Sequence, residues 1–255
     1  SPVAVVRCPS YQDDVLAALR QAWDHLGNPS LRGQRIVLKP NLVGYIPGPP
    51  ANTHPRVLEA AIRLCREQGA REVIVAEGMA FLREPGPVLE RSGVAAVLAA
   101  QGVPFVDLNY DDQRQVTLPG GYSGLKTLFL PRTILEADCL ISLPKLKTHH
   151  WAGVSLSLKN LLGVVPGIRY GWPKNALHLA GMPQSILDIY EAVAGSGFPS
   201  LSPALPTGDS NRRPAVWAIV DGIEGMEGDG PLYGSAVPSG ALVVGRDLAA
   251  VDATC

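Results

Sequence analysis

The sequence lacks the local signatures of the best-known metal and redox sites. Its four cysteines, Cys8, Cys65, Cys139 and Cys255, are scattered along the chain, and no two of them form a C-x-x-C pair. Zinc and iron–sulphur sites are usually built from such closely spaced cysteines. We therefore expect no 4Fe-4S cluster within this chain.

A charge excess and long apolar stretches are also missing. The formal net charge is −1 over 255 residues, so no general basic surface exists and we expect no nucleic-acid partner. No apolar run approaches the roughly 18 residues needed to cross a bilayer, which predicts no membrane span. Free thiols favour a reducing compartment such as the cytoplasm, although removal of an export leader would leave the same sequence.

Several catalytic motifs are absent as well. The chain has no Walker phosphate loop, no H-E-x-x-H and no G-x-S-x-G elbow. Four glycines between positions 222 and 230 have the wrong order and context for a dinucleotide-binding fingerprint. The function must therefore be inferred from the placement of individual polar residues.

The chain does have a regular alternation of strand and helix patterns. Short apolar runs predict strands, and capped amphipathic stretches predict helices. This alternation predicts one α/β domain over residues 1–255, with a mostly parallel open sheet and helices on both faces. The expected strands are 3–6, 35–38, 72–76, 104–108, 127–130, 138–143, 215–220 and 241–245, and the expected helices are 15–26, 55–68, 92–101 and 181–193.

Two segments fall outside this alternation. Residues 195–214 are rich in Gly, Ser and Pro without any period, which predicts a flexible loop or lid. Residues 246–255 look like the start of a further helix, so we expect the natural chain to continue beyond Cys255.

Polar clusters directly follow four of the predicted strands. In a parallel sheet the carboxyl ends of the strands share one edge, which is where ligands bind. The sequence therefore predicts a ligand site at that edge. The four clusters are 39–41, 77–78, 144–150 and 221–225.

The chemistry of these clusters indicates a small anionic ligand, a phosphate or a carboxylate, because lysines bind and stabilise negative charge. The adjacent His149 and His150 point in different directions in a helix or a strand, so we expect at most one of them to face the site. The plainer interpretation is solvated lysines, turn residues and a flexible acidic loop. The candidate residues are His54, His149, Lys145 and Lys159 for catalysis, Lys39, Asn41, Thr53, Lys147 and Asn160 for substrate binding, and Glu77, Asp221 and Glu227 for a divalent metal.

A series of motifs in one order resembles the Domain of Unknown Function 362 (DUF362) family over nearly the whole chain. Some members of that family carry a ferredoxin-like module that binds 4Fe-4S clusters, and this sequence has no such module. The resemblance implies no settled reaction. The motifs are Val-Leu-Lys-Pro-Asn-Leu-Val (37–43), Thr-His-Pro (53–55), Ala-Glu-Gly (76–78), Leu-Pro-Lys-Leu-Lys-Thr-His (143–149), Ser-Leu-Lys-Asn-Leu-Leu-Gly (157–163), the acidic glycine-rich run 220–231 and Gly-Arg-Asp-Leu-Ala-Ala-Val-Asp-Ala (245–253).

Three functional hypotheses follow. The leading one is an enzyme acting on a small anionic substrate with lysine and histidine groups and, as an option, a divalent metal. The second is a redox protein whose cluster lies on a ferredoxin-like partner or module. The third is a non-catalytic binding module for an anionic metabolite or cofactor.

Overall fold

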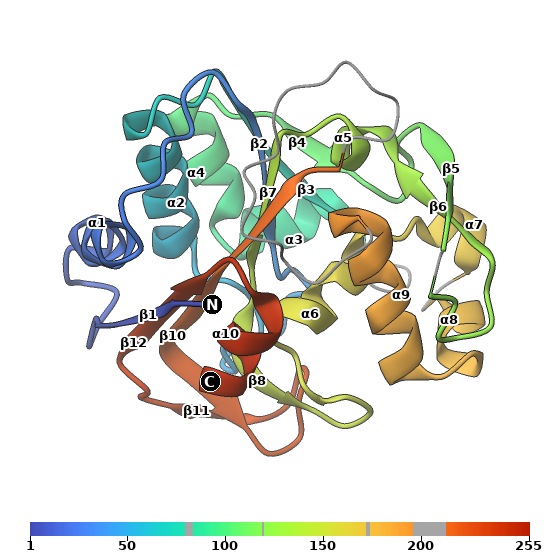
Figure 1. Cartoon of the computed structure of the whole chain (residues 1–255). Coiled ribbons are helices and arrows are strands. Elements are labelled where there is room, and N and C mark those ends of the chain that lie inside the picture. The colour runs from blue at the N-terminus through green and yellow to red at the C-terminus, as the bar shows by residue number, and fades with distance from the viewer. Residues whose placement is uncertain (80–83, 119, 172–173, 196–212) are drawn as a thin grey trace.

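A sheet of ten strands lies between two layers of helices in the computed structural model, which describes residues 1–79, 84–118, 120–171, 174–195 and 213–255 (Figure 1). A separate two-stranded sheet joins β5 and β6. The strands are β1 (Val3–Arg7), β2 (Arg35–Pro40), β3 (Glu72–Glu77), β4 (Phe105–Asp107), β5 (Gln113–Thr117), β6 (Thr127–Pro131), β7 (Cys139–Leu143), β8 (Lys145–His149), β9 (Gly153–Val154), β10 (Ala215–Glu227), β11 (Ser235–Val237) and β12 (Ala241–Gly245).

The helices follow the strands along the chain as expected for an α/β protein. They are α1 (Val15–His25), α2 (Pro55–Glu67), α3 (Pro85–Arg91), α4 (Val94–Gln101), α5 (Arg132–Leu135), α6 (Ser157–Asn160), the 3-10 helix η1 (Leu161–Val164), α7 (Gly167–Tyr170), α8 (Asn175–Leu179), α9 (Met182–Ala194) and α10 (Leu248–Thr254).

The main sheet is mostly parallel. Its strands run in the order β1-β12-β10-β7-β2-β3-β4. The neighbours from β10 to β4 pair in parallel, whereas β1 and β12 are antiparallel to their neighbours. The predicted fold class is thus confirmed.

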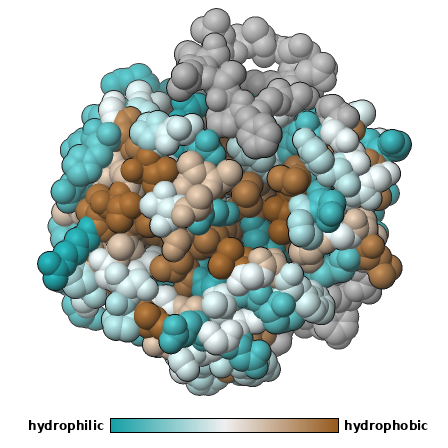
Figure 2. All heavy atoms as spheres, turned by 60° about the horizontal axis from the view of Figure 1, so that its bottom comes forward, coloured by the Kyte–Doolittle hydropathy of each residue, from teal (hydrophilic) through white to brown (hydrophobic). Residues whose placement is uncertain are grey.

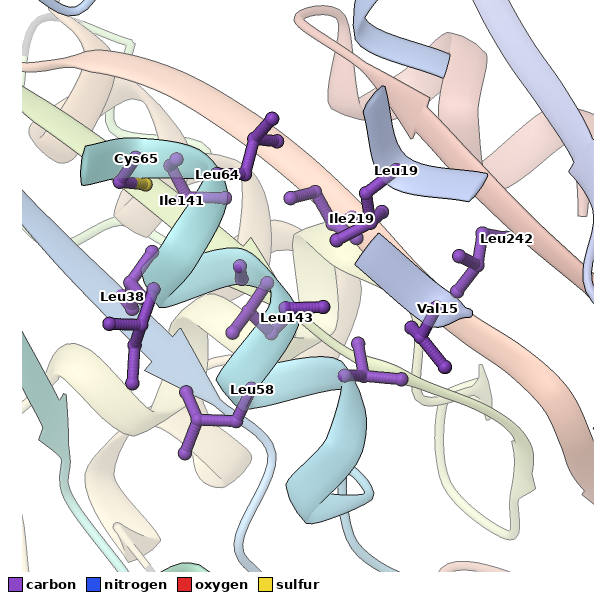
Figure 3. Close-up of a cluster of buried hydrophobic side chains, with 14 of the residues drawn as sticks. Val15, Leu19, Leu38, Leu58, Leu64, Cys65, Ile141, Leu143, Ile219 and Leu242 are labelled. Atoms are coloured by element: carbon purple, nitrogen blue, oxygen red, sulfur yellow. The ribbon is translucent and has the colours of Figure 1, made fainter. Parts of the chain in front are cut away.

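Helices cover both faces of the sheet because its strands are apolar on both sides. Side chains alternate between the two faces of a strand. In β2, Ile36 and Leu38 belong to the core beneath α1 and α2, while Val37 belongs to the core beneath α9, η1 and α10. Figure 3 shows the first of these cores, with Leu58 of α2 lying near Leu38.

The starts of two helices follow from local chemistry. The Asp14 side chain accepts a hydrogen bond from the Ala17 N–H at the start of α1. At the start of α2, His54 Nδ1 accepts from the Arg56 N–H at 3.1 Å, and Pro55 occupies the first turn. One ring nitrogen of His54 therefore already has a structural role.

Two segments that directly follow predicted strands are themselves strands. β10 continues to Glu227 and does not end at Val220, and β8 follows β7 after the single residue Pro144. A Cβ atom on Gly222 would lie 2.9 Å from the Ala241 carbonyl oxygen and 3.2 Å from Leu146 Cδ2. The plainer interpretation of a flexible acidic loop is wrong for residues 221–227, because they belong to β10. Gly222 allows neighbouring strands to approach β10 closely.

The predicted lid at 195–214 falls mainly on residues 196–212, which lie outside the described residues. Among the helices that are described, none is long and apolar enough to cross a membrane.

The strand order changes direction between β2 and β7. From β2 the chain proceeds outward to β3 and β4, whereas β7 leads the other way to β10 and β12. Ligands of open α/β sheets bind outside the carboxyl ends of the strands at such a switch point. Lys39 of β2 lies opposite Ser142 of β7 in the ladder at this point.

Candidate functional site

A cavity of about 280 Å³ lies at this edge of the sheet. Residues from the ends of β2 and β3 line it, together with residues from β8, from α6 and from the segment that precedes α8. Figure 2 turns the bottom of Figure 1, where β8 and β11 end, toward the viewer, and hydrophobic side chains gather across that face with small hydrophilic areas between them.

A buried ion pair lines the cavity. Lys39 Nζ lies 2.7 Å from Glu77 Oε1, and both side chains are almost completely buried. The Glu77 carboxylate also accepts hydrogen bonds from the backbone N–H groups of Leu42 and Gly78. Burial lowers the pKa of Lys39, and the neighbouring Glu77 charge opposes that shift.

The backbone at Gly163 lies directly against this pair. A Cβ atom at this position would lie 2.5 Å from Lys39 Nζ and would also collide with the Glu77 carboxylate. Only glycine therefore allows η1 to pack over the ion pair.

Asn160 joins the two strands at the switch point. Its Nδ2 donates to the Lys39 carbonyl oxygen and to Ser142 Oγ, while its Oδ1 accepts from Lys39 Nζ and Asn41 Nδ2. The Asn41 Oδ1 atom is buried and has no hydrogen-bond partner among the described residues. An unsatisfied buried acceptor is costly, and a donor group on a ligand would remove that cost.

Two further lysines bring surplus positive charge to the cavity. Lys159 Nζ has no hydrogen-bond or ion-pair partner in the described part of the chain, and burial lowers its pKa to about 8, with the Lys39 charge acting in the same direction. Lys174 donates to the carbonyl oxygens of Leu162 and Gly78, and burial lowers its pKa to about 7. The cavity thus contains three lysines and one carboxylate, which favours an anion.

The backbone of Lys174 adopts an unusual conformation. It is a non-glycine residue with a φ of 67°, in the left-handed region that costs free energy for residues with a Cβ. Such conformations persist where the surrounding structure requires them, often at functional sites.

Four aromatic rings line the cavity together. They are His149, His150, Trp151 and His178. The expectation that only one of the two adjacent histidines faces the site is wrong, because β8 ends at His149 and the chain turns there.

The imidazole of His149 is neutral near pH 7. Its Nδ1 accepts from the backbone N–H groups of Trp151 and Ala152, and burial lowers its pKa to about 3. The neutral ring must therefore carry its proton on Nε2. That nitrogen can donate a hydrogen bond to a ligand in the cavity.

A second group of buried polar residues lies apart from the cavity lining. Lys145 Nζ lies 3.0 Å from Asp221 Oδ2 and 2.5 Å from the Tyr11 hydroxyl, which in turn donates to Asp221 Oδ1. The backbone N–H of His54 also donates to Asp221, and the His54 ring stacks on Tyr11 with 3.7 Å between centroids. Two candidates for catalysis, His54 and Lys145, are therefore not among the residues that line the cavity.

Lys147 and Thr53 hold loops in place. Lys147 Nζ donates to the Ala51 and Pro231 carbonyl oxygens, and burial moves its pKa well below the usual value. Thr53 Oγ1 donates to the Leu143 carbonyl oxygen and accepts from the Asn41 N–H. These contacts fix the segment between β2 and α2 over the end of β7.

The three acids considered as metal ligands are not brought together. Glu77 and Asp221 each pair with a lysine, and Glu227 is exposed at the end of β10. Across the described residues, no three His, Cys, Asp or Glu side chains form a group that could hold a metal ion.

Sequence reasoning missed Lys174, His178 and Tyr11. Lys174 and His178 follow no predicted strand, and Tyr11 does not directly follow the strand expected at 3–6, so the rule that located the other candidates did not apply to them. The structure brings together Lys39, Asn41, Glu77, His149, Lys159 and Asn160 from the predicted set.

Comparisons with known proteins identify relatives of this chain. The family described as "Domain of unknown function (DUF362)" matches residues 36–255. The thylakoid-associated protein sll1697 of Synechocystis is 31% identical over 260 residues, which cover 98% of this chain and 72% of that protein.

Two solved structures are similar in fold. The lactate racemase apoprotein of Thermoanaerobacterium thermosaccharolyticum has a TM-score of 0.53 and 13% identity over 97% of this chain, which spans 55% of the racemase chain. A protein from Thermotoga maritima has a TM-score of 0.49 and 13% identity, over 95% of this chain and 59% of its own. The racemase likeness supports the α/β fold alone, because the identity is low.

Proposed function

Because the chain belongs to the DUF362 family, whose description gives no activity, we propose a function from the cavity itself: it is the active site of an enzyme that acts on a small carboxylate or phosphate. The observation that carries this proposal is the ammonium group of Lys159, which lies in the cavity without a partner among the described residues. A desolvated cation without a counter-ion favours binding of an anion.

The cavity residues suggest a division of roles. Lys39 and, in its protonated form, Lys174 supply a positive field that stabilises negative charge developing on the substrate. Lys159, with its pKa lowered to about 8, can give up or take a proton near neutral pH, as a general acid or base requires. His149, neutral and fixed by two backbone amides, donates a hydrogen bond through Nε2.

Lys159 is a better candidate for proton transfer than the two histidines. His54 lies in the Tyr11–Asp221 group and already caps α2. His149 has a pKa of about 3, which makes it a weak base at pH 7. The metal option and the partner-held cluster gain no support from the described residues, and the cytoplasmic location stays a prediction.

Calorimetric titration of acetate and inorganic phosphate into the purified protein tests the binding step. We expect Lys159→Met to weaken binding by about 10- to 100-fold, the scale of a hydrogen bond to a charged group. Lys126→Met is the matched control, because Lys126 is exposed and does not line the cavity. Unchanged anion affinity in Lys159→Met would refute the proposal.

Solvent exchange separates the enzyme from the binding module. Small carboxylates are incubated with the protein in heavy water, with lactate among them because one fold neighbour is a lactate racemase apoprotein. Incorporation of deuterium at the carbon next to the carboxylate supports an enzyme. Its loss in Lys159→Met at a carboxylate concentration that saturates the variant supports proton transfer at that residue. Tight binding without turnover of any carboxylate or phosphate ester would favour the non-catalytic alternative.

A further inference from the structure

The aromatic residues of the cavity form a continuous series of ring contacts. The centroids of His149 and His150 are 4.8 Å apart in a stacked arrangement, and His150 meets Trp151 edge-on at 4.7 Å. Trp151 in turn meets His178 edge-on at 4.9 Å. All four residues line the cavity, so a molecule within it faces several ring surfaces.

The backbone holds the three imidazoles of this series. His150 Nδ1 donates to the Gly230 carbonyl oxygen at 3.0 Å, and His178 Nδ1 donates to the Lys174 carbonyl oxygen at 3.1 Å. His149 Nδ1 is held by two amides, as described above. Each ring is thus fixed by one nitrogen, and the rings form a preorganised surface whose rotamer entropy is already lost before a ligand binds.

Trp151 is the exposed member of the series. Although Trp151 contacts two histidines, 60% of its surface remains accessible. A role in the hydrophobic core does not fit that exposure. A large exposed ring beside a cavity gains free energy if a ligand covers it.

Part of the cavity lining is apolar. Leu42, Val43, Met79 and Leu162 line the cavity together with its charged and aromatic residues. The cavity therefore offers cationic groups, apolar contacts and ring surfaces within about 280 Å³. A ligand that uses all of them has an anionic group joined to a flat, apolar ring.

We propose that the ligand of this cavity is an anion attached to a planar aromatic ring, with the anionic group at Lys159 and the ring against Trp151. This inference rests on the proposed function and specifies its substrate class. A carboxylate and a phosphate monoester share this chemistry, and the experiment below distinguishes them.

The test compares flat and puckered rings of similar size. Calorimetry measures the affinities of benzoate against cyclohexanecarboxylate, and of phenyl phosphate against cyclohexyl phosphate. The flat member of at least one pair should bind about 2- to 10-fold more tightly, which is the range of a single aromatic contact. The pair that shows the preference identifies the anionic group, and equal affinities within both pairs would overturn the inference.

The Trp151→Leu variant assigns the preference to the ring series. In this variant the ratio of the two affinities should fall to about 1, because leucine keeps apolar area and loses the flat surface. Tyr122→Leu, which removes a half-exposed ring that does not line the cavity, should keep the ratio of the parent protein. A flat-ring preference that survives in Trp151→Leu would contradict the proposal.

A spectroscopic measurement keeps the test valid if the variant folds poorly. The indole N–H signal of Trp151, assigned through the backbone resonances of the parent protein, should shift to higher field when benzoate or phenyl phosphate is added. Binding of acetate or phosphate with no such shift from either ring-bearing anion would defeat the ring inference and leave the proposed function standing. Failure of every anion to bind would defeat both.

Discussion

Two groups of lysines lie at the same edge of the sheet, and they differ in how their charge is balanced. Lys145 has Asp221 and Tyr11 as partners, and the Asp221 carboxylate also accepts from the backbone N–H of His54. In the cavity, Lys39 has Glu77, but Lys159 has no partner among the described residues. A closed set of partners is typical of a structural ion pair, whereas a surplus cation beside open volume indicates a ligand site.

The comparison also separates the roles of similar residues. Lys145 and Lys147 lie two positions apart on β8, and both are buried on the same side of that strand. Neither lines the cavity, because Asp221 holds one and carbonyl oxygens hold the other. A lysine near the cavity therefore does not necessarily bind ligand. Its role depends on whether other protein groups already pair with its ammonium group.

The largest expected effect comes from removing Asp221, the counter-ion of Lys145. Asp221→Ala leaves the Lys145 ammonium buried without its counter-ion, so the free energy of unfolding should fall by about 3–5 kcal/mol. Urea denaturation measures this loss, and Asp229→Ala, on the exposed turn after the same strand, should cost far less. Stability equal to that of the parent protein would show that the Lys145–Asp221 pair is not a structural element.

A smaller effect is expected from the corresponding change in the cavity. Glu77→Gln keeps the shape and removes the charge, while Asn160 and the Pro40 carbonyl still accept from Lys39. The free energy of unfolding should fall by about 1–3 kcal/mol, the cost of one unsatisfied buried group.

An anion distinguishes the two variants. Phosphate can replace the missing negative charge beside Lys39, so it should raise the melting temperature of Glu77→Gln more than that of the parent protein. In Asp221→Ala the shift should match that of the parent protein, because the anion does not reach the Lys145 group. Equal shifts of the melting temperature in all three proteins would contradict the distinction between the Lys145–Asp221 pair and the cavity lysines.

The smallest effect is a pH dependence that belongs to the cavity alone. Lys159 is protonated below its pKa of about 8, so the affinity for acetate should fall by about tenfold between pH 7 and pH 9 as that group loses its charge. Acetate is the suitable probe because its own charge does not change in this range. The Lys159→Met variant should show a flatter profile, and an identical profile would assign the titration to another group.

The stability of the ligand-free protein should change in the opposite direction. The pKa of Lys159 is lowered in the folded state, so between about pH 8 and pH 10.5 the unfolded chain binds more protons than the folded one. This contribution to stability is therefore fully present above the unfolded pKa and is lost as the pH falls toward 8. The difference between the unfolding free energies of the parent protein and Lys159→Met, measured across this range, checks the sign.

Local patterns were sufficient for most of the central sheet. The apolar runs that form β2, β3 and β7 predicted strands, and the proline and the stripe of apolar residues predicted α2. Strand β5, with the sequence Gln-Arg-Gln-Val-Thr, was missed because its polar residues give no apolar run. It forms by pairing with β6, and strand preference depends strongly on such a partner.

The extent of β10 also depends on pairing partners that local sequence patterns do not show. Residues 221–227 contain glycines and acids, which taken alone indicate a turn. In the folded chain β8 and β11 pair with this segment, and Asp221 lies directly opposite Lys145. The Lys145–Asp221 ion pair depends on the register between two segments that are far apart in sequence. The spacing of residues within either segment does not predict that register.

By itself, the sequence determined the alternation of strands and helices and the edge of the sheet where the polar residues gather, because both follow from local periodicity and from the parallel direction of the strands. Only the tertiary structure decided which lysine has a counter-ion, and that Lys174 and His178, which follow no predicted strand, join the cavity. The physical reason is that the partners of a charge, and hence its burial cost and its pKa, are set by groups far away in sequence that meet it only in the folded chain.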